Sequence, residues 1–343
     1  MNHTENTRIV LAARPDGRPT TSDFRLEHSP VPEPADGEVL LENLYLSLDP
    51  YMRWRMSAAK SYAEPVGIGE VMVGGTVARI KQSRHSDWHE GDTVLAYAGW
   101  QRFALSNGQD LRRLDPSIAH PTTALGVLGM PGFTAYAGLL NIGKPKPGDT
   151  VVVAAASGAV GSVVGQIARL QGARVVGIAG GADKCAFVKD ELGFDAVIDH
   201  RAPDFAEQLA KACPDGIDVY FENVAGPVWD AVRPLLNNFA RIPVCGLIAH
   251  YNDGAIQHAQ ADRLPATMHD ILAKSLTVRG FIQTEFVDQQ QDRFLQEAAQ
   301  WIAEGKLKFR EDIIDGLAQA PEAFIGLLEG RNFGKLPVGL NPQ

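Results

Sequence analysis

The segment from Val151 to Gly181 constrains the fold of this chain more than any other. It reads VVVAAASGAVGSVVGQIARLQGARVVGIAGG. The valines predict a buried strand, the small residues after them predict a tight loop, and the apolar spacing beyond Gly161 predicts a helix. A second apolar run at 174–179 predicts another strand. A strand, a glycine-containing loop, a helix and a second strand, in this order, form the βαβ unit that binds nucleotide phosphates.

The loop carries the dinucleotide-binding fingerprint with one departure, because Ala156 replaces its first glycine. We expect Gly158 to let the backbone approach the pyrophosphate, and Gly161 to let the helix pack close to its strand. The start of the helix would add N–H groups and a partial positive charge. Such a turn can also be purely structural, but the flanking strands and helix stand where a cofactor site requires them. The loop residues expected at the cofactor are Ala156, Gly158, Ala159, Val160 and Gly161.

The residues at the tip of the second strand indicate whether the site prefers NAD or NADP. An NAD site usually has an acidic residue there to bind the ribose hydroxyls, whereas this strand ends on Gly180 and Gly181. Two glycines leave room for a 2′-phosphate, and Lys184 can neutralise its charge. The alternative ribose ligand, Asp183, lies beyond the tip and is also a good helix cap. We therefore expect NADP(H).

Two further residues could donate to the same phosphate. His200 and Arg201 directly follow the third predicted strand. A lone histidine at such a place is more often an ordinary surface residue, and Lys184 could likewise be a solvated lysine in the first turn of a helix. The sequence leaves open whether His200 or Arg201 would contact the phosphate.

The rest of the chain predicts two domains. Residues up to about 125 alternate short apolar runs with Gly and Pro, as in a compact β domain. The middle alternates strands and helices, as in a doubly wound parallel sheet, and the last forty residues return to short elements. We expect a β-rich domain of residues 1–126 and 302–343 and a nucleotide-binding domain of residues 127–301. The strands expected in the second are 151–155, 174–179, 196–199, 218–222, 241–247 and 276–282.

Composition narrows the possible partners. The chain has 343 residues, 45% of them hydrophobic, and a formal net charge of −9, which argues against nucleic-acid binding. No apolar run is long enough to span a membrane, and the polar start MNHTENTRIV does not resemble a secretory signal. The three cysteines, Cys185, Cys213 and Cys245, form no CxxC pair, so we expect neither a disulfide framework nor a zinc lobe, and a cytoplasmic location.

The sequence predicts chemistry without a metal. Catalytic zinc needs about three Cys, His or carboxylate ligands, and the early segment LSLDPYMRWRM (46–56) contains neither Cys nor His. His85 and His89 have the i, i+4 spacing of a helical ligand pair. Their segment is turn-like, however, and a solvent-exposed loop is the better interpretation.

Six blocks of the chain resemble one family, the zinc-independent medium-chain dehydrogenases/reductases of the prostaglandin reductase, leukotriene B4 12-hydroxydehydrogenase and 2-alkenal reductase type. The similarity extends to its bacterial NADPH-dependent, curcumin reductase-like members. The blocks are LSLDPYMR (46–53), GMPGFTAYAGLL (129–140), AASGAVGSVVGQIA (155–168), YFENVAG (220–226), CGLIAHYN (245–252) and GRNFGK (330–335). The resemblance implies a GroES-like β domain, a Rossmann domain and commonly a homodimer. It also implies NADPH-dependent reduction of the double bond of α,β-unsaturated aldehydes and ketones.

Matching the motifs residue by residue assigns candidate sites. Tyr251 would be the catalytic residue and would contact the substrate together with Tyr51 and Met130. The cofactor residues that the resemblance adds to the loop are Thr134, Lys184, His200, Asn223, Cys245, Phe281, Asn332 and Gly334. In isolation, Tyr51 and Cys245 would be interpreted as packed core residues, and Asn332 as part of an ordinary turn.

Two positions depart from the family pattern. His200 stands where members often have a tyrosine, which leaves that phosphate contact open. Ala225 stands where members usually have glycine, a change expected only to tighten the turn.

Two other functions remain open. A quinone reductase can use the same scaffold without zinc, and a protein of this fold can bind NADPH without catalysis. Tyr251, which follows the fifth predicted strand, is the best candidate donor to the substrate carbonyl, since a phenol can donate a hydrogen bond and pass a proton. Its neighbour His250 is a weaker candidate.

Overall fold

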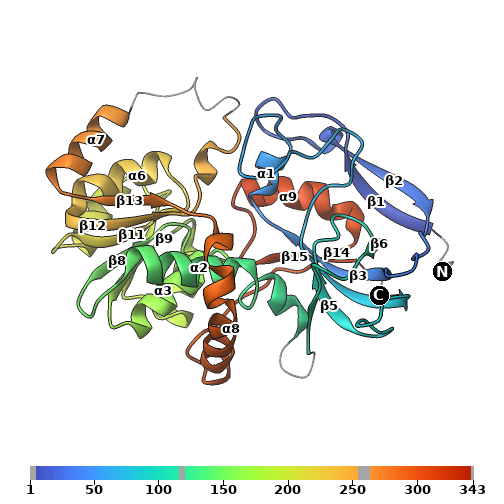
Figure 1. Ribbon diagram of the computed structural model, residues 1–343. Coiled ribbons are helices and arrows are strands. Elements are labelled where there is room, and N and C mark those ends of the chain that lie inside the picture. The colour runs from blue at the N-terminus through green and yellow to red at the C-terminus, as the bar shows by residue number, and fades with distance from the viewer. Residues whose placement is uncertain (1–4, 116–119, 254–262, 341–343) are drawn as a thin grey trace. The chain divides into compact units, whose positions relative to one another are not determined.

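The computed structural model describes residues 5–115, 120–253 and 263–340, and these form two units (Figure 1). The first unit contains the described residues within 1–125, 251–254 and 311–343. The second contains those within 126–250 and 255–310. The domain boundaries expected from the sequence, at 126/127 and 301/302, stay a prediction.

A six-stranded parallel sheet forms the centre of the second unit. Its strands lie in the order β10-β9-β8-β11-β12-β13. In chain order this is 3-2-1-4-5-6, the arrangement of a doubly wound Rossmann sheet, so the predicted fold class is confirmed. The strands are β8 (Thr150–Val153), β9 (Arg174–Ala179), β10 (Ala196–Asp199), β11 (Ile217–Phe221), β12 (Leu236–Val244) and β13 (Thr277–Gly280).

Helices cover both faces of this sheet (Figure 1), which is why all four residues of β8, three of them valines, can be buried. Helix α2 packs beside α3, and α5 packs beside α6. The helices of this unit are α2 (Met130–Gly138), α3 (Gly161–Leu170), α4 (Ala182–Ala186), α5 (Phe205–Ala212), α6 (Gly226–Val232), α7 (Leu264–Ala273) and α8 (Val287–Ala303).

The first unit is β-rich, as predicted. Its larger sheet has the order β14-β15-β3-β4-β5-β7, with β6 also paired to β3, and a separate hairpin joins β1 to β2. The strands are β1 (Glu5–Leu11), β2 (Phe24–Pro30), β3 (Val39–Leu48), β4 (Thr76–Ser83), β5 (Thr93–Ala96), β6 (Phe103–Ser106), β7 (Arg112–Arg113), β14 (Ile314–Asp315) and β15 (Leu336–Gly339).

A core that contains several aromatic residues packs strands of the unit against helices α1 (Met52–Arg55) and α9 (Ala320–Leu328). The buried ring of Trp100 stacks on Phe24 at a centroid distance of 5.5 Å, and Phe324 of α9 meets both rings edge-on. The core therefore joins the N-terminal strands to the C-terminal helix.

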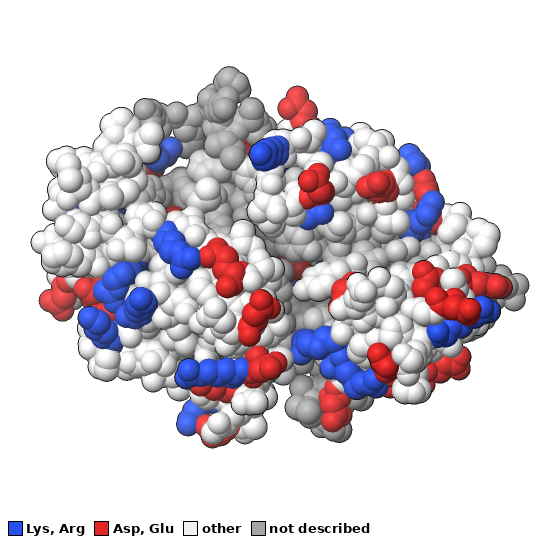
Figure 2. All heavy atoms as spheres, viewed as in Figure 1, with Lys and Arg blue, Asp and Glu red and all other residues white. Residues whose placement is uncertain are grey.

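Within the part of the chain that the structure describes, no helix has the length and apolar character needed to cross a membrane. On the face shown in Figure 2, acidic and basic side chains are interspersed.

Candidate functional site

The glycine-containing loop lies between the end of β8 and the first residue of α3, Gly161. A Cβ atom on Gly161 would lie 2.3 Å from the carbonyl oxygen of Ala155, so only glycine fits this position. The same atom on Gly158 would lie 3.2 Å from that oxygen, a tight contact. The loop is thus compact at the positive end of the α3 dipole, and it fits the pyrophosphate of a dinucleotide.

Asn223 and Cys245 follow strands β11 and β12 at the carboxyl end of the sheet. The Asn223 Nδ2 atom donates to the carbonyl oxygen of Ala154 at 2.8 Å. The backbone amide of Cys245 donates to the carbonyl oxygen of Glu222 at 2.9 Å. Burial, and then the charge of Glu222, raise the pKa of the Cys245 thiol to about 12. A thiol with such a raised pKa stays protonated near neutral pH.

The buried carboxyl of Glu222 organises the same edge, and sequence reasoning did not single it out. Its Oε1 atom accepts hydrogen bonds from the Tyr220 hydroxyl at 2.9 Å and from the amides of Val224 and Ala225 at 2.7 and 2.8 Å. Burial raises its pKa. The signal in the sequence was an acidic residue at the end of an apolar run, which is unusual for a buried position.

Ala225 does more than tighten the turn, so that expectation was wrong. Its backbone has φ 65° and ψ −153°, a region that residues with a Cβ adopt only under strain. The bond from its amide to Glu222 helps to hold this conformation.

Basic side chains gather at the tip of β9. A Cβ atom on Gly180 would lie 2.7 Å from His200 Nε2 and 3.1 Å from Arg201 Nε, so both side chains lie against this glycine. Burial, then the charge of Arg201, lower the pKa of His200, and Lys184 is close enough to contribute. Asp183 lies in the first turn of α4, beyond the strand. The absence of a side chain on Gly180 thus lets His200 and Arg201 lie against the strand tip, where both can donate to a phosphate.

Three other predicted residues of the second unit lie on α2 or pack against it. Thr134 follows Met130 by one helical turn, and its hydroxyl donates to the Met130 carbonyl oxygen at 2.7 Å. This leaves the lone pairs of the Thr134 oxygen as acceptors. Phe281 is buried against Gly138, where an added Cβ would lie 2.3 Å from its ring. Its place in the core is shown, and its contact with a cofactor stays a prediction.

In the first unit, Tyr51 and the partner of Tyr251 both belong to the turn and helix that follow β3. Tyr51 directly precedes α1, and burial together with the charge of Asp49 raises its pKa well above the usual value. Trp54 of α1 meets the ring of Tyr251 at 5.3 Å and an angle of 70°. The segment of Tyr251 is thus grouped with the first unit, although it follows β12 in the chain.

Arg53 of α1 forms a hydrogen bond with Asn252, the residue after Tyr251. Its Nη2 atom donates to the carbonyl oxygen of Gly17 at 2.7 Å, and its Nε atom donates to Asn252 Oδ1 at 3.3 Å. Arg53 is buried, so these bonds are shielded from water. Neither Arg53 nor Trp54 was expected to have a role from the sequence.

Asn332 and Gly334 form a turn elsewhere in the first unit. The Asn332 Nδ2 atom donates to the Gly334 carbonyl oxygen at 2.8 Å, and Gly334 has φ 82°, a conformation that favours glycine. Asn332 also lines a hollow of about 240 Å³ together with Arg331 and Leu336.

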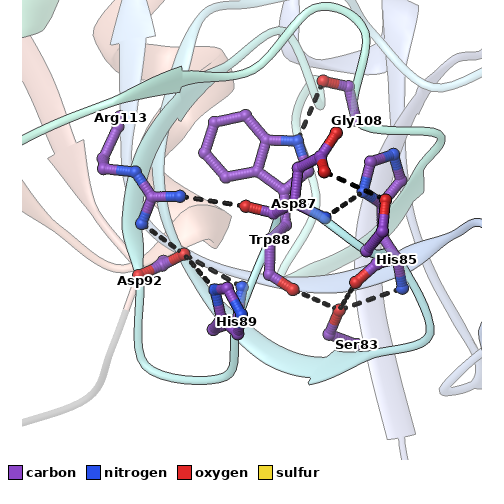
Figure 3. Close-up of polar contacts among 9 residues, drawn as sticks. Ser83, His85, Asp87, Trp88, His89, Asp92, Gly108 and Arg113 are labelled. Atoms are coloured by element: carbon purple, nitrogen blue, oxygen red, sulfur yellow. Dashed lines mark hydrogen bonds and ion pairs between the residues drawn. The ribbon is translucent and has the colours of Figure 1, made fainter.

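The loop that carries His85 and His89 uses both histidines in local contacts (Figure 3). His85 Nδ1 accepts a hydrogen bond from the amide of Asp87 at 3.0 Å, whereas His89 lies beside Asp92. Asp92 also pairs with Arg113 at 2.5 Å. Among residues 5–115, 120–253 and 263–340, no group of three or more His, Cys, Asp or Glu side chains is placed to hold a metal ion.

Comparisons with known proteins agree with this architecture. A family described as the N-terminal domain of oxidoreductase matches residues 7–114, and one described as zinc-binding dehydrogenase matches residues 159–304. The NADPH-dependent curcumin reductase of Escherichia coli strain K12 is 56% identical over 333 residues, which cover 97% of this chain and 96% of that protein. Prostaglandin reductase 1 of Oryctolagus cuniculus is 41% identical over 325 residues, covering 93% and 89%.

A solved structure extends the similarity to three dimensions. The crystal structure of CurA in complex with NADPH from Vibrio vulnificus has a TM-score of 0.95 and 57% identity, and covers 98% of this chain and 100% of that one. The chain therefore belongs to the medium-chain dehydrogenase/reductase family, among its curcumin reductase-like and prostaglandin reductase-like members.

Proposed function

We propose that this protein reduces the carbon–carbon double bond of α,β-unsaturated aldehydes or ketones with NADPH. The observation that carries the proposal is the 56–57% identity, over nearly the whole chain, to a protein named NADPH-dependent curcumin reductase and to CurA crystallised with NADPH. The protein is an NADP-dependent oxidoreductase. The class of unsaturated carbonyl compounds is the proposed part.

The second unit supports the choice of cofactor. The loop at Gly158 and Gly161 excludes side chains where a pyrophosphate would lie. We assign the 2′-phosphate to Lys184, together with His200 and Arg201, whose side chains lie against Gly180. We further assign Thr134, Asn223, Cys245, Phe281, Asn332 and Gly334 to the remainder of the cofactor.

The first unit supports a conjugated substrate. Tyr62 and Tyr97 are more than half exposed and close enough to Tyr51 to raise its pKa, and Trp54 and Tyr251 form an edge-to-face pair. Exposed aromatic rings favour flat, apolar partners. We therefore infer that enones bearing an aromatic ring are better substrates than short aliphatic enals, with Met130 as an additional contact.

Bound NADPH supplies a hydride to the β-carbon of the substrate. The task left to the protein is to stabilise the negative charge that develops on the carbonyl oxygen. We assign this task to the Tyr251 hydroxyl, which can donate a hydrogen bond and then pass a proton toward the α-carbon. Trp54 and the Arg53–Asn252 bond orient the segment that carries it.

We also propose a homodimer formed through the second unit. Strand β13 is an edge of its sheet, and its four residues are all exposed. Helix α7 exposes Leu264, Met268 and Leu272 at 62%, 54% and 82%. An unpaired strand edge beside apolar side chains is a surface that a second copy would cover. Light scattering of the purified protein should give twice the chain mass.

The proposed function is tested by following NADPH oxidation with an aryl enone, an aliphatic enal and a quinone, and by identifying the products. We expect the saturated ketone from the aryl enone, at a rate unchanged by dialysis against a strong chelator. Turnover of the quinone alone would assign a quinone reductase instead. NADPH binding without any turnover would make the protein a non-catalytic binder.

Tyr251→Phe tests the assigned donor. The variant keeps the ring and its contact with Trp54 but removes the hydroxyl. We expect kcat to fall roughly 100- to 1000-fold, since that is the usual loss for a donor aimed at developing charge, while NADPH affinity stays close to wild type. A variant that keeps most of the wild-type kcat would exclude the hydroxyl from catalysis.

A further inference from the structure

A buried ion pair in the first unit connects two segments to which different binding tasks have been assigned. Lys335 Nζ lies 2.5 Å from Asp49 Oδ1 and donates to the carbonyl oxygen of Leu48 at 2.9 Å. The side chains of Lys335 and Asp49 are only 4% and 8% exposed. The hydroxyl of Ser47 donates to the other carboxylate oxygen of Asp49. Both charges are therefore paired away from water.

The pair lies one position beyond the end of a β-ladder. Leu336 of β15 is opposite Leu48 of β3 in antiparallel register, so Lys335 and Asp49 face each other where both chains leave the sheet. Ser47 precedes Asp49 by two residues and so shares its face of the strand. The ion pair therefore joins the two chains directly beyond the last backbone pair of the β3–β15 ladder.

On one side, the backbone of Asp49 begins a helical turn. The amide of Met52 donates to the carbonyl oxygen of Asp49 at 3.1 Å, and the amide of Trp54 donates to that of Tyr51 at 3.0 Å. Tyr51 thus lies within a turn that begins at Asp49. A displacement of Asp49 would move the Tyr51 ring as well.

On the other side, Lys335 ends the segment that contains Asn332. The Asn332 side chain closes a turn onto Gly334, the residue next to Lys335. The carbonyl oxygen of Lys335 accepts a hydrogen bond from the amide of Asp312 at 2.7 Å. Lys335 is therefore fixed by both its side chain and its backbone, and the turn at Asn332 is fixed with it.

We propose that Lys335 and Asp49 are positioning residues that hold the turn of Tyr51 and the turn of Asn332 in one fixed arrangement. The inference rests on the proposed function, which assigns substrate contact to Tyr51 and cofactor contact to Asn332. Stability alone does not explain such a pair, because apolar residues of similar volume often replace a buried ion pair without loss of stability. An apolar replacement that keeps the stability but lowers activity would therefore distinguish a positioning role from a purely structural one.

The test compares a single, an apolar and a control variant. Lys335→Met leaves the carboxylate of Asp49 buried without its partner, so we expect a much lower Tm. Ser47→Ala/Asp49→Leu/Lys335→Met replaces the network with apolar side chains and should recover a Tm close to that of wild type. We nevertheless expect its kcat/KM for the enone to fall by roughly 100-fold, the effect of a small misplacement of binding groups, and its NADPH dissociation constant to rise.

The matched control is Glu42→Leu/Lys81→Met, which removes an ion pair of 3.5 Å between β3 and β4 in the same unit. It should leave the kinetics unchanged. Asp49→Glu keeps the charge but lengthens one side of the pair by a methylene, and it serves where the apolar variant does not fold. We expect it to raise KM for the enone while the protein stays folded.

Wild-type kcat/KM and NADPH affinity in the folded apolar variant, or a wild-type KM in folded Asp49→Glu, would overturn the positioning role. Failure of the proposed function looks different, since the wild-type protein would then reduce no enone. NADPH binding, measured by nucleotide fluorescence, would still test the half of the inference that concerns Asn332.

Discussion

We assign the preference for NADPH to a few basic side chains around Gly180 and Gly181. A lysine contact with a 2′-phosphate is a charge-assisted hydrogen bond, worth about 1.5–3 kcal/mol. Lys184→Ala should therefore raise KM for NADPH at least about tenfold and change the kinetics with NADH little. Steady-state kinetics with both cofactors measure this.

Two variants complete that test. Lys189→Ala, an exposed lysine in the following turn, should leave both cofactors unaffected. Arg201→Ala should weaken NADPH alone, because its side chain lies against Gly180. Equal losses with NADPH and NADH in Lys184→Ala would show that Lys184 is structural.

Ala225 stores strain that glycine would relieve. Its positive φ costs a residue with a Cβ roughly 1–3 kcal/mol. Ala225→Gly should therefore raise Tm by a few degrees in thermal unfolding. Ala231→Gly, at an ordinary helical position of α6, is the matched control and should lower Tm, since glycine costs about 1 kcal/mol in a helix. A lower Tm in both variants would contradict the strain.

For single residues, the sequence predicted those that belong to a local motif. It missed those whose role depends on partners that only the fold brings close. Gly161 follows from the loop motif, and its close approach to Ala155 is confirmed. Glu222 was missed because its partners are the amides of a turn that folds back on it, and Lys335 because its partner, Asp49, is 286 residues away in the chain. The strain at Ala225 was missed because a dihedral angle is not readable from one residue type.

The loop after β8 and helix α3 contain two glycines with different tasks. Substituting Gly161 should reduce stability, whereas substituting Gly158 should reduce cofactor binding. Gly161→Ala places a Cβ against the Ala155 carbonyl oxygen, and such overpacking typically costs about 1–3 kcal/mol. It should lower the Tm of the cofactor-free protein. Gly158→Ala has a milder contact, so it should keep the Tm but weaken NADPH binding.

Thermal unfolding with and without NADPH distinguishes the two variants. Gly75→Ala is the control, because a Cβ there would make only ordinary contacts, at 3.8 Å or more. A Tm that falls equally in Gly158→Ala and Gly161→Ala would show that both glycines serve packing only.

Element boundaries followed from the sequence where strands are regular. The predicted range 174–179 is confirmed for β9, because its apolar run ends at two glycines. Strand β12 begins at Leu236 and not at 241, because its first part, LNNFA, is partly polar and exposed. Phe239 there has a positive φ, and the register to β11 shifts nearby. Such irregular backbone has no period for a sequence pattern to follow.

At the scale of the whole molecule, the chain divides so that residues distant in sequence share a unit. The C-terminal residues from Glu311 join the N-terminal β unit, and Tyr251 is grouped there as well. Sequence alone placed Tyr251 at the end of the fifth Rossmann strand and could not show its contact with Trp54. That contact depends on packing between segments almost two hundred residues apart.

The central claim is that hydride passes from NADPH to the β-carbon of an unsaturated carbonyl compound. It is tested most directly with NADPH that carries deuterium at the transferable position of its nicotinamide ring and with an aryl enone as substrate. Mass spectrometry and NMR of the product locate the label. We expect a saturated ketone with deuterium on the β-carbon and a solvent proton on the α-carbon. An allylic alcohol with deuterium on the former carbonyl carbon would contradict it.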